Sequence, residues 1–215
     1  SIVNGGTISG GYAGYLLFQS FLNGDIANNG SLGGGNVGIR MSYSTVSGGI
    51  NNSGSIASGN YGVYLRSSAI QGGFTNTGKL EGGSLGFHLA NSTLSGSFTN
   101  SGIVVGGNYG VYLYQSAANG GFTNSGSIIG VVAGLLVDGA STVSGGIVNN
   151  AGGYISSINN AGYIDGISVV SDATSGQLIN QGIVTATGAA VHVKNATLSG
   201  DLINLGRISG QTGVL

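Results

Sequence analysis

The 215-residue chain contains no cysteine, no proline and no tryptophan, and few of its residues carry a charge. Without cysteine it has neither disulfides nor thiolate metal ligands, so its composition favours no particular redox compartment. Five lysines and arginines stand against six acidic residues, which gives a net charge of −1. Five cations are too few to form the basic surface that neutralises phosphates, so the composition excludes a nucleic-acid-binding protein.

The lack of proline indicates a particular kind of structure. Average usage near 5% would give about ten prolines in a chain of this length. Proline has no N–H group and is excluded from strands with a neighbour on both sides, so its absence favours extensive stacked β-structure. A disordered chain is excluded as well, because 40% of the residues are apolar and the mean hydropathy is +0.31.

Long hydrophobic runs are missing too. The most apolar stretch, 128–137, is interrupted by Gly130 and Gly134. It is far short of the roughly 18 residues that a transmembrane helix needs. We therefore expect no insertion of this segment into a membrane.

What the chain does contain is a repeat of 24 residues. An apolar residue opens each unit and is counted here as position 1. These openers are Ile2, Ile26, Ile50, Phe74, Phe98, Phe122, Ile147, Leu178 and Leu202. The consensus unit reads roughly F-T-N-S-G-S-I-x-G-G-x-Y-G-V-Y-L-x-x-S-T-L-S-G-G. A fixed period of this length is the signature of a repeat architecture.

Glycine and the apolar spacing decide the fold class. The 46 glycines recur too often for helices, because each interior glycine costs about 1 kcal/mol relative to alanine. Val63 and Leu65 alternate with Tyr64 and Arg66, which is the period of a strand. Each unit therefore reads as about three short strands, with turns at N-x-G, at the G-G or G-N pair, and at S-G-G. Since only stacked copies can bury the apolar face, we predict an all-β fold, a parallel β-helix (β-solenoid) with about nine coils of 24 residues.

Position 3 is asparagine in every unit. If position 1 points inward, position 3 does so too, and a buried amide is tolerable only when it is hydrogen-bonded. Stacked asparagines can donate from one amide to the next, so we predict an internal ladder with a structural role. Its members are Asn4, Asn28, Asn52, Asn76, Asn100, Asn124, Asn149, Asn180 and Asn204.

Residues 147–177 disturb the repeat, because this unit is 31 residues long. It contains Asn-Asn-Ala-Gly twice, at 149–152 and 159–162, so either Asn149 or Asn160 could occupy position 3. We expect a single domain, 1–215, with an irregular coil or loop insertion at 147–177. Ser1 directly precedes an opener and Leu215 falls inside a unit, so we expect the chain to be part of a longer solenoid or of a stack.

The unit I/F-T-N-S-G-x-I-x-G, followed by Y-G-V-Y-L and S-T-L-S-G-G, resembles the passenger repeats of bacterial autotransporters and related large surface adhesins. The resemblance covers essentially the whole chain. It implies a right-handed parallel β-helix that is secreted to the bacterial cell surface and acts in adhesion, aggregation or surface display. It brings no catalytic motif.

A β-helix can also carry an enzyme, which would need clustered carboxylates or a metal site on adjacent coils. The acidic residues are Asp25, Glu81, Asp138, Asp165, Asp172 and Asp201. Only Asp165 and Asp172 form a local group, so a carbohydrate-active enzyme with residues in 147–177 is one alternative. His88 and His192 both occupy position 15 but lie four or more units apart, so they are not expected to ligate one metal. We predict no catalytic residue, no metal and no cofactor.

One surface feature stands out from the repeat. Position 15, which is expected to face outward, holds Tyr64, His88 and Tyr112 in successive units, and Tyr61, Tyr109 and Tyr114 are close by. Such a strip could stack on sugars or pack against another rod. Strict alternation would instead turn Tyr61 and Tyr109 inward at position 12. For the whole group, the alternative to a binding role is that these rings only stack on one another between neighbouring coils.

These observations predict a structural and adhesive segment of a secreted bacterial surface protein. We expect it to mediate adhesion or self-association without catalysis, with partners that are copies of itself, surface glycans or host proteins. A self-assembling extracellular fibre subunit and the enzyme named above are the alternatives.

Overall fold

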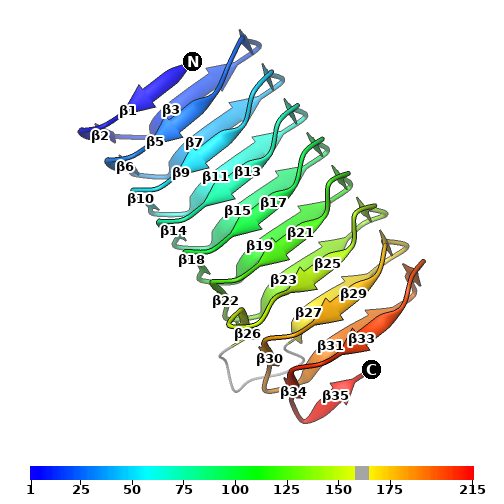
Figure 1. Cartoon of the computed structure of the whole chain (residues 1–215). Helices are drawn as coiled ribbons and strands as arrows, with labels where there is room; N and C mark the ends of the chain where they lie inside the picture. Colours follow the sequence, from blue (N-terminus) through cyan, green and yellow to red (C-terminus); the bar gives the residue numbers. More distant parts are fainter. Residues whose placement is uncertain (158–164) are drawn as a thin grey trace.

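The computed structural model describes residues 1–157 and 165–215 and shows an all-β rod (Figure 1). Successive coils stack along one axis, and the two termini lie at opposite ends of the stack (Figure 1). The strands form four parallel sheets that run the length of the rod, and strands of consecutive coils are neighbours in every sheet. The predicted β-solenoid of about nine coils of 24 residues is therefore confirmed.

Each sheet collects one strand from each coil. Sheet 1 contains β1 (Ile2–Asn4), β5 (Ile26–Asn28), β9 (Ile50–Asn52), β13 (Phe74–Asn76), β17 (Phe98–Asn100), β21 (Phe122–Asn124), β25 (Ile147–Asn149), β29 (Leu178–Asn180) and β33 (Leu202–Asn204). Sheet 2 contains β2 (Thr7–Gly10), β6 (Ser31–Gly34), β10 (Ser55–Ser58), β14 (Lys79–Gly82), β18 (Ile103–Gly106), β22 (Ser127–Gly130), β26 (Tyr154–Ser157), β30 (Ile183–Thr185) and β34 (Arg207–Ser209). Sheet 3 contains β3 (Ala13–Phe18), β7 (Val37–Ser42), β11 (Tyr61–Arg66), β15 (Leu85–Ala90), β19 (Tyr109–Tyr114), β23 (Ala133–Asp138), β27 (Asp165–Val170), β31 (Ala189–Lys194) and β35 (Thr212–Val214). Sheet 4 contains the two-residue strands β4 (Phe21–Leu22), β8 (Thr45–Val46), β12 (Ala69–Ile70), β16 (Thr93–Leu94), β20 (Ala117–Ala118), β24 (Thr142–Val143), β28 (Thr174–Ser175) and β32 (Thr197–Leu198).

The core is a set of columns in which like residues stack on like. Phe74 pairs in register with Phe98, and Phe98 with Phe122. Their ring centroids are 5.2 Å and 4.9 Å apart, and all three side chains are almost fully buried. Burying such a side chain stabilises the fold by roughly 1.5–3 kcal/mol, so the stacking of coils holds the rod together.

A glycine column explains why the strands of sheet 3 depart from strict alternation. Gly62 and Gly86 at position 13 are skipped in the ladder between β11 and β15. A Cβ on Gly62 would lie 2.6 Å from the side chain of the buried Leu80, so position 13 faces the core. Position 14 faces the core as well, because Val63 is fully buried. Two consecutive inward positions break the alternation in every coil alike, and Tyr61 at position 12 is thereby turned outward.

The number of strands per coil differs from the expected three. A corner at positions 17–19 separates sheet 3 from the short strands of sheet 4, and it uses no glycine in most coils. Instead, residues with side chains adopt left-handed backbone at position 18: Gln19 (φ 46°), Tyr43 (53°), Ser67 (47°), Asn91 (49°) and Gln115 (50°). This conformation costs roughly 1–2 kcal/mol for a residue with a Cβ. Because the corner contains no glycine in most coils, the glycine pattern of the sequence does not indicate it.

The disturbed unit keeps its place in the stack. β25 pairs with β21 on one side and with β29 on the other, with Asn149 opposite both Asn124 and Asn180. Asn149 is therefore the position 3 residue of this coil. Asn160 and the whole second Asn-Asn-Ala-Gly motif, 159–162, lie outside the described residues. The extra residues fall between Asn149 and Tyr154 and between Ser157 and Asp165.

Candidate functional site

The predicted asparagine ladder runs through the whole rod. Each Nδ2 donates to the Oδ1 of the next coil at 2.7–2.9 Å, from Asn4 through Asn28, Asn52, Asn76, Asn100, Asn124, Asn149 and Asn180 to Asn204. All of these residues are buried except Asn204, which is exposed. The ladder thus forms an unbroken internal column of amides.

The hydrogen-bonding capacity of these amides is used inside the protein. Asn100 Nδ2 donates to Asn124 Oδ1 at 2.8 Å and approaches the carbonyl oxygens of Gly102 and Ser127 at 3.2 Å and 3.1 Å. Its Oδ1 accepts from Asn76 Nδ2 at 2.8 Å. Because these contacts satisfy the buried amide, the ladder stabilises the turn between sheets 1 and 2 and leaves no group free for a ligand.

A second ladder, of serines, was missed by the sequence interpretation. At position 19, Ser44, Ser68 and Ser92 are buried, and each accepts a hydrogen bond from the backbone N–H at position 19 of the preceding coil at 3.1 Å. Each hydroxyl also donates to the carbonyl oxygen two residues earlier, at 2.8–2.9 Å. The serine of the S-T-L triplet in the consensus was the available signal.

The tyrosine and histidine residues singled out on the surface do come together on sheet 3. The rings of Tyr64, His88 and Tyr112 stack across β11, β15 and β19, with centroids 5.0 Å and 4.9 Å apart and planes inclined by 13° and 9°. Tyr61 stacks on Tyr64 at 4.8 Å, and Tyr109 packs on Tyr112 at 5.1 Å. Tyr114 lies 6.3 Å from Tyr112 at the edge of the group. We call these six residues the aromatic strip.

The strip extends toward the N-terminus through a cation. The guanidinium carbon of Arg40 lies 5.7 Å from the ring centroid of Tyr64 and 5.6 Å from that of Tyr12, and Arg40 also donates to the Tyr12 hydroxyl. Cation–π contacts of this kind attract the guanidinium to the ring face. Tyr12, Arg40 and the strip thus form one continuous column over five coils.

The orientation of the rings limits what the strip can bind. Rings of adjacent coils lie face to face, so the faces of Tyr64, His88 and Tyr112 are largely covered by their neighbours. What remains for a partner is mainly ring edges and tyrosine hydroxyls. Tyr61 and Tyr109 belong to this outward group, because they pack on Tyr64 and Tyr112, so the inward alternative at position 12 is wrong.

His88 is a neutral member of the stack. Both of its ring nitrogens are buried, and among the described residues they have no hydrogen-bond partner. Burial lowers the pKa of His88 from 6.5 to about 4, because the charged form loses its hydration there. At the other end of the strip, the Tyr112 hydroxyl donates to Asp138 at 3.2 Å. Burial, and next the charge of Asp138, raise the pKa of Tyr112 and of Tyr109.

The acidic residues are not grouped as the sequence suggested. Asp165 begins β27, and Asp172 lies beyond the far end of that strand at a left-handed backbone position. Asp165 occupies position 12, opposite Ala133. Its Oδ2 lies 2.9 Å from Nδ1 of His192 on the next coil, and both side chains are largely buried. Lys79 and Glu81 form a solvent-exposed ion pair on β14.

Within residues 1–157 and 165–215, no cluster of three histidine or acidic side chains is arranged to hold a metal ion. The same residues form no helix that could span a membrane. Comparisons with models of protein families, with curated proteins and with solved structures found no match to this chain.

Proposed function

We propose that this chain is a structural and adhesive segment of a secreted bacterial surface protein, and that it acts through adhesion or self-association without catalysis. The aromatic strip carries the proposal. It is an outward-facing band of five tyrosines and one histidine on a regular rod, and it continues through Arg40 to Tyr12. Contiguous aromatic surfaces of this kind mark interaction sites.

The electrostatics of the chain support the same proposal. A net charge of −1 over 215 residues gives little repulsion between copies. Since the ring faces within the strip are taken by neighbouring rings, its edges and hydroxyls suit a flat partner, such as the side of a second rod, better than a sugar laid on a ring face. Secretion and the bacterial cell surface enter the proposal through the resemblance of the repeats.

The test removes the strip without touching the core. We would compare the full chain with the double variant Tyr64→Ser and Tyr112→Ser, and use Tyr154→Ser as a control, since Tyr154 is a half-buried tyrosine on sheet 2. Sedimentation velocity over a range of concentrations measures self-association, and the settling of bacteria that display the chain measures adhesion between cells.

We expect the wild type and the control to associate and the double variant to lose that association, with circular dichroism spectra unchanged. The proposal is wrong if the wild type stays monomeric and bacteria displaying it do not settle. It is also wrong if the double variant associates as strongly as the wild type.

The pairing of Asp165 with His192 keeps one alternative open for testing. A partly buried carboxylate beside an imidazole is an arrangement that general-base catalysts use, so it favours the carbohydrate-active enzyme over the fibre subunit as second candidate. Incubation with bacterial and plant polysaccharides, followed by measurement of released reducing sugar, decides this point. Cleavage by the wild type that is lost in Asp165→Asn would replace the adhesive proposal.

A further inference from the structure

A shallow groove follows the corner between sheets 3 and 4. It consists of two adjoining hollows of about 450 Å³ and 430 Å³ that meet at Asn91. One rim carries the left-handed residues of position 18, the other carries position 20, and the buried serines of position 19 lie between them. The rims are formed by Tyr43, Ser67, Asn91, Gln115, Thr45 and Thr93. We call this feature the corner groove.

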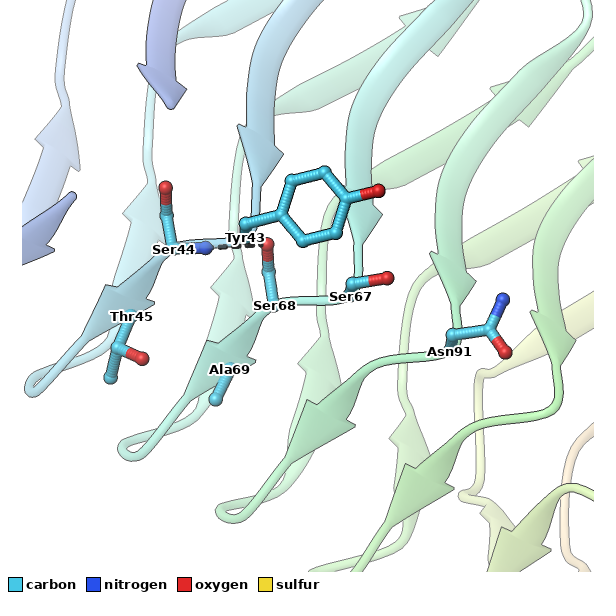
Figure 2. Close-up of a pocket in the computed structure, with 7 residues that line it drawn as sticks. All are labelled: Tyr43, Ser44, Thr45, Ser67, Ser68, Ala69 and Asn91. Atoms are coloured by element: carbon cyan, nitrogen blue, oxygen red, sulfur yellow. Dashed lines mark hydrogen bonds between the residues drawn. The ribbon is translucent and has the colours of Figure 1, made fainter. Parts of the chain in front are cut away.

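Side chains of successive coils project in a row along this groove. Figure 2 shows Tyr43, Ser67 and Asn91 pointing the same way from three neighbouring coils. Because coils follow one another at about 4.8 Å, the row offers a polar or aromatic group at each such step along the rod. A linear polymer that lies parallel to the rod axis would meet them in turn.

The residues of this row keep their side chains at backbone positions that glycine would occupy with less strain. Tyr43, Ser67, Asn91 and Gln115 all have φ between 47° and 53°, a region that glycine enters without strain. The chain has 46 glycines, and many of them lie where the backbone of a neighbouring coil approaches closely, yet these four coils keep a side chain at this corner. Strained residues that persist over consecutive units indicate a role for their side chains.

The groups of this row are free to bind. Within the described part of the chain, the side chains of Ser67, Asn91 and Gln115 make no hydrogen bond, and all three are exposed. The serines of the floor, such as Ser68, are satisfied by the backbone and only shape the groove. The rim therefore supplies unused donors and acceptors over a preformed floor.

The chemistry of the lining selects a class of ligand. Every residue that the structure places in the lining is uncharged, and hydroxyls and amides predominate. Tyr43 adds an aromatic ring that is 52% exposed, with the exposed ring of Phe18 beside it at 6.4 Å. The guanidinium carbon of Arg66, which is not part of the lining, lies 6.0 Å from the centroid of this ring. Uncharged hydroxyl and amide groups with an aromatic platform match the alternating hydroxyls and C–H faces of a neutral sugar.

We propose that the corner groove binds a neutral linear glycan, with its chain running along the rod axis. The inference rests on the proposed adhesive function and gives it a ligand class. In this arrangement Tyr43 packs on one sugar ring, while Ser67, Asn91 and Gln115 hydrogen-bond to hydroxyls of successive units.

The decisive variant is the triple substitution Ser67→Gly, Asn91→Gly and Gln115→Gly. Glycine removes the side chains and relieves the left-handed backbone, so the variant should keep the circular dichroism spectrum and the melting temperature of the wild type. The probes are cellohexaose, xylohexaose, maltohexaose and chitohexaose, with an oligogalacturonate as the charged comparison, and binding is measured by isothermal titration calorimetry.

A matched control alters the same three coils at another corner. Ser53→Ala, Thr77→Ala and Ser101→Ala remove three exposed polar side chains at the turn between sheets 1 and 2. We expect the wild type and this control to bind at least one neutral probe. The glycine variant should bind it at least about tenfold more weakly, since three hydrogen-bonding groups are lost.

The proposal is overturned if the folded glycine variant binds as the wild type does, if the control loses binding equally, or if no neutral probe binds the wild type. Preference for the oligogalacturonate would also contradict it. Cell settling and sedimentation of the wild type separate the two proposals. If the wild type associates but binds no neutral glycan, only the groove inference fails, whereas a wild type that does not associate removes the adhesive function itself.

Discussion

Two neighbouring asparagines on β9 allow a clean test of the amide ladder. Asn52 points inward, is 1% exposed and belongs to the ladder, whereas Asn51 is exposed on the same strand. Asn52→Ala and Asn51→Ala are therefore the same chemical change at adjacent positions, and they alter strand propensity equally. Any difference in stability between them measures the inward environment.

The magnitude follows from the contacts that are lost. Asn52 Nδ2 donates to Asn76 Oδ1 at 2.7 Å and to the carbonyl oxygen of Lys79 at 2.9 Å, and Asn52 Oδ1 accepts from Asn28 Nδ2 at 2.8 Å. Removing the amide leaves the buried Asn76 Oδ1 without its donor from the ladder, and an unsatisfied buried group costs about 1–3 kcal/mol. With the small cavity added, we expect Asn52→Ala to lower the free energy of unfolding by about 2–4 kcal/mol.

Chemical denaturation followed by circular dichroism is the appropriate assay, with each variant measured against the wild type. Asn51→Ala should change the free energy of unfolding by no more than about 0.5 kcal/mol, as exposed substitutions do. Stacked coils need not unfold in one step, so the first transition is the one to compare. Equal effects of the two substitutions would refute the argument that the inward amides stabilise the rod.

Three further outcomes follow from the stacking of coils. Because burial lowers the pKa of His88 from 6.5 to about 4, the unfolded chain binds more protons than the folded chain between these two pH values. Stability should therefore fall as the pH drops from about 6.5 to 4, by on the order of 3 kcal/mol, and urea titrations of His88→Phe should show a shallower fall. Gly86→Ala should destabilise strongly or prevent folding, because its Cβ would lie 2.5 Å from a backbone carbonyl oxygen of the next coil; a melting temperature like that of the wild type would contradict this. Ser92→Ala leaves a buried N–H of the preceding coil without an acceptor, so calorimetry should show a lower melting temperature and a loss of about 1–3 kcal/mol.

The repeat predicts the features that depend on identical residues meeting each other. Asparagine at position 3 had to stack on asparagine once the fold was a solenoid, and phenylalanine at position 1 on phenylalanine. The sequence could not choose between Asn149 and Asn160, because both follow an acceptable spacing. In the structure Asn149 pairs with Asn124 on one side and with Asn180 on the other, so Asn149 is the position 3 residue.

Other features depended on backbone detail that a pattern of apolar residues does not carry. Tyr61 faces outward because Gly62 occupies the inward position before Val63, and alternation alone predicts the reverse. Ser67 adopts a left-handed backbone conformation at its corner, and because no glycine occupies that position, the sequence does not predict a turn there. Asp165 reaches His192 because the extra residues of the disturbed unit shift it to position 12, and the repeat alone does not reveal that shift.

The amide ladder also gives the rod a direction. Every Nδ2 from Asn4 to Asn180 donates toward the C-terminal neighbour, so the amide dipoles point the same way in each described coil. Two copies that met with like ends together would set acceptor against acceptor or donor against donor in this column. Only head-to-tail contact would prolong it, and such a contact is heterologous and does not close on itself. Axial assembly through the ladder would therefore yield polar filaments, whereas contacts through the side of the rod are free to obey two-fold symmetry.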